Sequence, residues 1–178
     1  MQFELYNKET APANSQTLLD NSLKAFGMIP NLHAIMAEAP ELLEGYQILH
    51  QLFQKTSFDA EEITVVWQTI NVEHECHYCV PAHTGIAHMM KVDSAVTDAL
   101  RNRTELPTKK LQILHLTTLA LVRNRGHLSE EELTVFFEAG FEKRQLLEII
   151  LGVSQKVMSN YVNHLADTPV DKAFQKFA

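Results

Sequence analysis

Apolar residues recur at helical spacing along most of this chain, and that pattern limits the fold more than any other feature. A continuous apolar face follows Pro40, a residue suited to the first turn of a helix, and ends near Lys55. The segment from Asp59 to Ile70 carries β-branched residues that would also suit a strand, but no neighbouring segment alternates with a period of two to pair with it. We therefore predict a helix there and an all-α fold.

Capping residues indicate where further helices begin. A Ser, Thr, Asp or Asn side chain can accept a hydrogen bond from the first turn, and a Glu three residues later completes a capping box. The helix starts that we predict from this rule lie at Asp59, Asp93, Thr108 and Ser129. The last long helix is predicted over residues 143–165. One face of this helix carries Leu146, Ile150, Val153, Val157 and Tyr161.

Length and composition favour one globular domain over residues 1–178. The chain is 46% hydrophobic and 21% charged, so it can bury a substantial core. Residues 1–16 have no clear periodicity, and we expect them to form an arm laid over the surface. No apolar run approaches the roughly 20 residues that cross a membrane, and the N-terminus lacks the pattern of a secretory signal. We expect a cytoplasmic protein that does not bind a membrane.

The charge distribution argues against a nucleic-acid partner. The formal net charge is −7 at pH 7, and the Lys and Arg residues are scattered along the chain. A protein that binds nucleic acid usually gathers its cations into a patch or stripe. Small molecules and other proteins are therefore the expected partners.

Both cysteines lie in one short stretch, as a Cys-x-x-Cys pair made of Cys76 and Cys79, with His83 four residues further on. In a reducing compartment such a pair is more often catalytic or metal-binding than structural. Pro81 is tolerated in the first turn of a helix, so a helix should start near the pair and run to about Lys91. The pair is therefore predicted at a helix N-terminus.

That position favours redox chemistry. A helix N-terminus or a nearby cation lowers the pKa of a thiol, and the thiolate is the reactive form. His83 could act as the base that takes the thiol proton, with Glu73 as the carboxylate that orients it. A thiolate that attacks a peroxide becomes a sulfenic acid, which a second thiol converts to a disulfide. The same pair could instead exchange with the disulfide of a partner.

A zinc site is an alternative use of the two sulfurs. Tetrahedral zinc accepts mixed thiolate and imidazole ligands. The histidines that could complete such a site are His74, His77 and His88. In this alternative the protein is a zinc-stabilised binding domain without turnover.

The segments Cys76-His77-Tyr78-Cys79 and Ala82-His83, together with the apolar helix before them, resemble the alkyl hydroperoxidase D-like branch of the carboxymuconolactone decarboxylase superfamily. The resemblance covers about residues 59–171. It implies an all-helical subunit that assembles into dimers, trimers or hexamers, and a thiol peroxidase or related reductase. In that family Cys79 would attack the peroxide, Cys76 would resolve the intermediate, and His83 would relay the proton together with a glutamate.

The relay glutamate of that family falls on Thr64 in this chain. Glu73 is the substitute that we prefer, because Glu62 already serves as a capping residue. The expected substrate is a small hydroperoxide or another small molecule. We see no nucleotide or flavin signature, so we expect no cofactor and a dithiol protein as electron donor. Decarboxylation of a small organic acid, with the cysteines incidental, is the other alternative within the superfamily.

Overall fold

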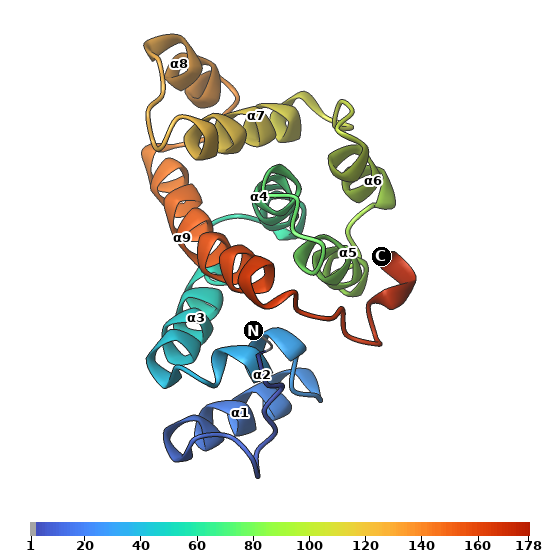
Figure 1. Cartoon of the computed structure of the whole chain (residues 1–178). Helices are drawn as coiled ribbons and strands as arrows, with labels where there is room; N and C mark the ends of the chain where they lie inside the picture. The colour runs from blue at the N-terminus through green and yellow to red at the C-terminus, as the bar shows by residue number, and fades with distance from the viewer. Residues whose placement is uncertain (1–2) are drawn as a thin grey trace.

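Helix α4 (Ala60–Glu73) runs through the middle of the molecule, and the other long helices surround it (Figure 1). A computed structural model describes residues 3–178 of the chain. Every residue of α4 from Glu62 to Asn71 is buried, which explains why its sequence lacks a polar side. The helices that pack against α4 are α5 (Cys79–Met89), α6 (Ser94–Asn102), α7 (Lys109–Arg123) and α9 (Lys143–Ala166).

A smaller group of helices covers the other side of α9. It consists of α1 (Ala13–Phe26), α2 (Asn31–Met36) and α3 (Pro40–Phe53). Helix α8 (Glu130–Glu138) packs on α7, and a 3-10 turn (Gln175–Phe177) packs on α5 (Figure 1). Within residues 3–178, no helix combines the length and the apolar composition that crossing a bilayer requires.

The all-α prediction is confirmed, since the described residues contain helices and turns but no strand. The four predicted helix starts are also confirmed by hydrogen bonds. Each of the side chains Asp59, Asp93, Thr108 and Ser129 accepts from a backbone N–H in the first turn of its helix. The β-branched central segment forms a helix, α4. A helix that is buried on every side can carry apolar β-branched residues all round, so these residues do not require a strand.

The predicted N-terminal arm is partly wrong. Residues 1 and 2 lie outside the described residues, but residues 13–16 belong to helix α1. Ser15 is fully buried there and its hydroxyl donates to the carbonyl oxygen of Ala37 at 2.6 Å. Prediction failed because a short helix with few large apolar residues shows little periodicity in sequence.

The apolar face of α9 that the sequence indicates is only partly buried, since Leu146 and Val153 pack against the core and other members do not. Ile150 and Tyr161 are 41% and 55% exposed, whereas Ile149, Gly152 and a row of polar residues are buried. The helix is therefore rotated relative to the position that its most conspicuous apolar stripe indicates. Its buried side carries polar groups for the site described below.

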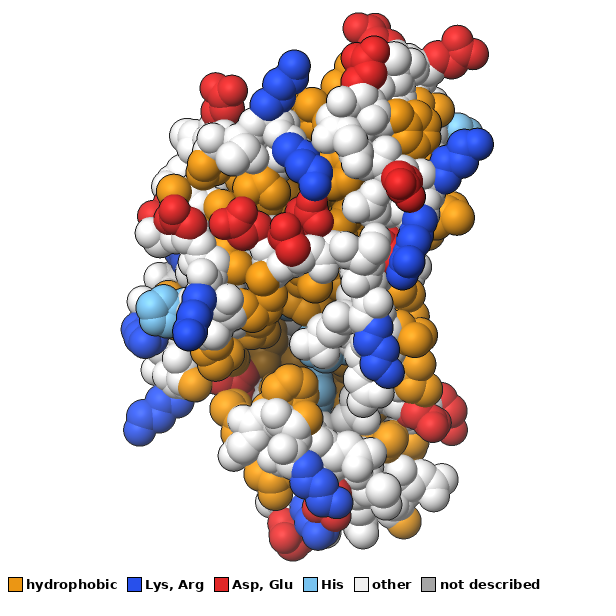
Figure 2. Space-filling view, turned by 180° about the vertical axis from the view of Figure 1, so that it is seen from behind, with side chains coloured by type: hydrophobic (Ala, Val, Ile, Leu, Met, Phe, Trp, Pro, Cys, Tyr) orange, Lys and Arg blue, Asp and Glu red, His pale blue; other side chains and the backbone are white. Residues whose placement is uncertain are grey.

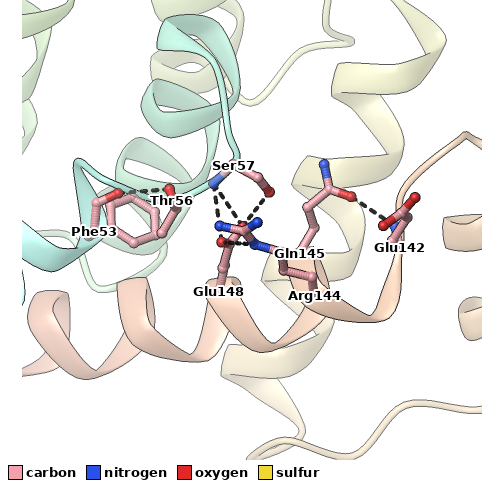
Figure 3. A network of polar contacts seen from close by, with 7 residues as sticks. All are labelled: Phe53, Thr56, Ser57, Glu142, Arg144, Gln145 and Glu148. Atoms are coloured by element: carbon pink, nitrogen blue, oxygen red, sulfur yellow. Dashed lines mark hydrogen bonds and ion pairs between the residues drawn. The ribbon is translucent and has the colours of Figure 1, made fainter.

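Hydrogen bonds at the start of α9 fix this rotation (Figure 3). The carboxylate of Glu148 accepts from the backbone N–H and the hydroxyl of Ser57, in the loop before α4. Arg144 donates to the same carboxylate at 2.8 Å from one turn earlier on α9. The backbone N–H of Glu142 donates to the side chain of Gln145, which caps the helix. The first two turns of α9 are thus tied to the loop before α4.

Gly152 should tolerate no side chain, because α9 approaches two other helices there. A Cβ atom on Gly152 would lie 2.8 Å from the ring of Phe53 and 2.9 Å from Val66. We predict that Gly152→Ala lowers the free energy of unfolding by about 1–3 kcal/mol, the usual cost of overpacking. Urea denaturation measures this change.

The control is Gly45→Ala in α3, where the nearest atom to a new Cβ is the flexible end of Met158 at 3.7 Å. Alanine at that helical position should leave stability unchanged or raise it by up to about 1 kcal/mol. Equal effects of the two substitutions would contradict the close approach at Gly152.

Candidate active site

The two cysteines lie where α4 ends and α5 begins. Glu75 adopts a positive φ of 53° and reverses the chain, so that the N–H of Cys76 reaches the carbonyl oxygen of Asn71. Cys79 is the first residue of α5, as predicted. Both thiols are free and buried, and the N–H of Cys79 donates to the sulfur of Cys76 at 3.2 Å. The positive end of the α5 dipole therefore acts at Cys79.

A row of polar side chains on α9 faces the two sulfurs. Its members follow helical spacing and each is fully buried: Lys156, Ser159, Asn160 and Asn163. The amide of Asn163 donates to the sulfur of Cys79 at 3.2 Å and lies 3.8 Å from that of Cys76. The hydroxyl of Ser159 lies 3.8 Å from the Cys79 sulfur. We call these four residues the α9 polar row.

The ammonium group of Lys156 is paired with His83. Its Nζ lies 2.7 Å from Nε2 of His83, and both residues are buried. Burial, helped by the charge of Lys156, holds the pKa of His83 well below its ordinary value, so the ring is neutral. Because an ammonium group can only donate, Nε2 accepts and the ring proton lies on Nδ1.

Lys156 also sets the state of Cys79. Burial alone would raise the pKa of the Cys79 thiol, but the hydrogen bond with Cys76 and the charge of Lys156 lower it further than burial raises it. The polar side chains of Ser159 and Asn160 act in the same direction. The hydrogen bond with Cys79 and burial raise the pKa of Cys76. Cys79 is therefore the thiolate of the pair, and Cys76 remains a thiol.

The structure brings Cys76, Cys79 and His83 together, but it does not bring Glu73 to them. Both carboxylate oxygens of Glu73 accept from Arg123 of α7, at 2.6 and 2.9 Å. Glu73 cannot orient His83 from there. The base role predicted for His83 also meets an obstacle, because Lys156 occupies its free nitrogen and no hydrogen bond among the described residues joins His83 to a sulfur.

The other candidate carboxylate is engaged as well. Glu62 accepts from the N–H of Asp59 in its capping box and pairs with Lys110 at 2.7 Å. Thr64, which stands where the resemblance places a glutamate, donates to the carbonyl oxygen of Ala60 at 2.8 Å. The charged partner of His83 is therefore Lys156, whereas the resemblance implied a glutamate as its partner.

The histidines of the zinc alternative point to other partners. His74 pairs with Asn160 at 2.9 Å, and His77 with the carbonyl oxygen of Thr168 at 3.0 Å. His88 lies beside the ring of Phe177. Among residues 3–178, no three His, Cys, Asp or Glu side chains converge to hold a metal ion.

The C-terminal segment is bound to the motif through Tyr78, between the two cysteines. The Tyr78 hydroxyl donates to the carboxylate of Asp171, which also accepts from the N–H of Asn31 at 3.0 Å. The chain then continues to Phe174 and Phe177, which lie so close to Gly85 of α5 that a Cβ there would clash with both rings. The last residues of the chain therefore pack directly against the helix that carries Cys79.

A cavity of about 330 Å³ opens on Cys79. Residues of α1, α2, α3, α5 and α9 and of the C-terminal segment line it, and Cys79, His83 and Lys156 form its polar floor. Figure 2 shows a hollow in this face of the molecule with hydrophobic walls and histidine atoms inside it. Cys76 does not line the cavity, so a small molecule that enters it meets Cys79 first.

Sequence reasoning missed Lys156 and Asn163. The side chain of His164 is exposed, whereas Asn163 faces the sulfurs. The signal that could have found the α9 polar row was present: polar residues at i, i+3, i+4 and i+7 within a helix that is otherwise rich in apolar residues.

The fold is that of the alkylhydroperoxidase AhpD core. An uncharacterized peroxidase-related protein with that core, from Ralstonia eutropha JMP134, has a TM-score of 0.86 at 15% identity over 97% of this chain and 93% of its own. A peroxidase-related protein from Silicibacter sp. TM1040 has a TM-score of 0.81 at 16% identity over 100% and 95%. Neither a protein-family model nor a curated protein matches the sequence.

The debrominase Bmp8 has the same fold. Its apo structure has a TM-score of 0.76 at 15% identity, over 93% of this chain and 90% of its own. A cysteine-to-alanine variant of that protein, in complex with 2,3,4-tribromopyrrole, has a TM-score of 0.77 at 14% identity over 98% and 97%. The fold thus occurs both in peroxidase-related proteins and in a debrominase.

Removing the charge of Lys156 should raise the pKa of Cys79. The cation favours the thiolate over the thiol, so in Lys156→Met the thiolate absorbance near 240 nm should appear at higher pH. Reaction of Cys79 with a small alkylating agent at neutral pH should slow in parallel. The matched control is Lys143→Met, at the exposed start of the same helix. An unchanged titration midpoint in Lys156→Met would show that the lysine does not stabilise the thiolate.

Proposed function

We propose that this protein is a thiol-dependent oxidoreductase that reduces a small molecule in the cavity and oxidises Cys79 and Cys76 to a disulfide. The observation that carries the proposal is the state of Cys79. Its sulfur lines a cavity, next to a buried cation and an amide donor, and its backbone N–H donates to the sulfur of the second thiol. Thiolate character, access for a small molecule and an adjacent thiol are what two-electron dithiol chemistry needs.

A hydroperoxide is the first candidate substrate. The Cys79 thiolate attacks the terminal oxygen, an S–O bond forms, and the O–O bond breaks. The leaving alkoxide takes a proton from the ammonium group of Lys156 and departs as an alcohol. The thiol of Cys76 then condenses with the sulfenic acid on Cys79, which releases water and gives the disulfide. Lys156 thus has the proton-transfer role that the resemblance gave to a carboxylate.

An external dithiol would return the disulfide to two thiols by exchange. Because Cys79 lines the cavity and Cys76 does not, the attack of the donor should occur at the sulfur of Cys79. The thiol of Cys76 would then be the leaving group of the first exchange step.

Thiol titration before and after substoichiometric cumene hydroperoxide tests the peroxidase reaction. We expect two thiols to be lost per peroxide, and mass analysis should find a Cys76–Cys79 disulfide. In Cys76→Ser the reaction should stop at a sulfenic acid on Cys79, and in Cys79→Ser it should lose at least two orders of magnitude in rate. Two thiols that survive excess peroxide would rule out this activity.

Reductive debromination is the second candidate, favoured by the likeness to the debrominase and by the apolar cavity. In that reaction the Cys79 thiolate attacks the bromine of an aryl bromide, and an S–Br bond forms as the C–Br bond breaks. The aryl carbanion takes a proton from Lys156. Cys76 then displaces bromide from Cys79, which gives the same disulfide and returns a proton to the lysine.

Bromide release distinguishes the two candidates. The reduced protein is mixed with 2,3,4-tribromopyrrole, and bromide and protein thiols are counted after a single turnover. If debromination is the activity, one bromide should appear for each disulfide, and Cys79→Ser should release none. Disulfide formation with cumene hydroperoxide but no bromide from the pyrrole would leave the peroxidase reaction as the proposed activity.

A further inference from the structure

We propose that the cavity binds small, uncharged aromatic compounds that carry one hydrogen-bond acceptor, and that the Nδ1–H group of His83 holds that acceptor. The inference rests on the proposed function, since it names the class of molecule that reaches Cys79. The evidence comes from the walls, the charges and one unpartnered atom of the cavity.

The cavity wall is built from rings. The aromatic and imidazole side chains that line it are Phe26, His33, Tyr46, His50, Tyr78, His83 and Phe174. Several of these rings contact other rings edge-on or by stacking. The ring centroids of His33 and Tyr46 lie 5.4 Å apart in an edge-on contact. His50 stacks on Trp67, behind the wall, with an interplanar angle of 5°. Such a fixed set of ring faces and edges favours a flat aromatic guest.

The wall is also nearly free of charge. Burial lowers the pKa of His33 to about 3 and that of His50 to about 4, so both rings are neutral at pH 7. Of the residues that line the cavity, only Lys156 is a Lys, Arg, Asp or Glu. Its charge is already matched by the Cys79 thiolate. A carboxylate or an ammonium ion on the ligand would therefore be desolvated without a partner.

One polar atom of His83, a residue that lines the cavity, has no partner. Nδ1 of His83 is buried and forms no hydrogen bond among the described residues, although Nε2 of the same ring is paired with Lys156. The pairing at Nε2 leaves the proton on Nδ1, so this atom is a donor. A buried unsatisfied donor is costly. The ring of His83 lines the cavity that exposes Cys79, so an acceptor on a molecule bound there can satisfy this donor when the side chains that cover Nδ1 move aside.

The volume of the cavity and the apolar residues at its entrance agree with a ligand of one or two rings. The volume of about 330 Å³ lies at the lower end of the roughly 300–1,000 Å³ of small-molecule sites. Phe26 and Met89 line the cavity and remain 45% and 65% exposed. These apolar side chains give a hydrophobic guest a surface to contact as it enters.

Binding of four small probes tests the inference without any redox step. They are 2-phenyl-2-propanol, cumene, tert-butanol and benzoate, which vary the ring, the acceptor and the charge one at a time. Affinities come from calorimetry and from the fluorescence of Trp67, the single tryptophan of the chain, whose ring lies 4.8 Å from that of His83. We expect 2-phenyl-2-propanol to bind about two- to tenfold more tightly than cumene, the ratio that one net hydrogen bond gives.

The aromatic alcohol should also bind at least tenfold more tightly than tert-butanol or benzoate. His83→Phe should remove its advantage over cumene, while the affinity for cumene itself changes by less than about twofold. The inference is overturned if benzoate or tert-butanol binds as tightly as the aromatic alcohol, if no probe binds, or if the variant keeps the preference. The comparison of probes on the native protein decides the question even if His83→Phe does not fold.

The same measurements on Cys79→Ser separate this inference from the proposed function. Because the serine variant cannot form a disulfide, the expected order of affinities in it supports the ligand class independently of the chemistry. Disulfide formation with a purely aliphatic hydroperoxide, together with no binding of the aromatic alcohol, would support the oxidoreductase and reject the ligand class.

Discussion

The buried ammonium group of Lys156 is the constraint on which the rest of the site depends. An unpaired charge in the interior costs several kcal/mol, so a lysine with no exposed surface persists only with partners. Here the partners are the thiolate of Cys79 and Nε2 of His83. They come from the start of α5, whereas the lysine comes from α9, so the charge pairing requires these two helices to pack in one register.

Contacts along α9 hold it in the position that pairs Lys156 with Cys79 and His83. Gly152 allows the helix to approach α3 and α4, and Glu148 ties its first turns to the loop before α4. Asn163 extends the contact to the sulfurs one turn beyond Ser159. The helix therefore gives its best-packed side to polar groups and leaves a row of apolar side chains exposed. Its orientation therefore does not maximise the burial of apolar surface.

Much of the fold could be predicted because its signals are local. Caps such as Asp59 and Ser129 act within one turn, and Pro81 limits where α5 can begin. The rotation of α9 could not be predicted, because it depends on contacts with residues far away in sequence. The strongest apolar stripe of a helix is a good guide only when its buried side carries no polar site.

The difference between local signals and contacts that are distant in sequence also explains which site residues could be predicted. Cys76, Cys79 and His83 are close in sequence, and their spacing reveals them. Glu73 is equally close, but it sits at the end of α4, where the charge of Arg123 lies nearer than the motif. Lys156 is far from the motif in sequence, and the helical spacing of the α9 polar row, its one local signal, does not say that the row faces the cysteines. Its identification required the structure.

The C-terminal segment has a consequence for how the protein is made. The partners of the cysteine motif, from Lys156 to Asp171 and Phe174, are supplied by the last part of the chain, which leaves the ribosome after the cysteines do. Until α9 has been synthesised, Cys76 and Cys79 have neither its cation nor its amide donor. The groups that stabilise the thiolate of Cys79 therefore reach it only when α9 has packed against α5.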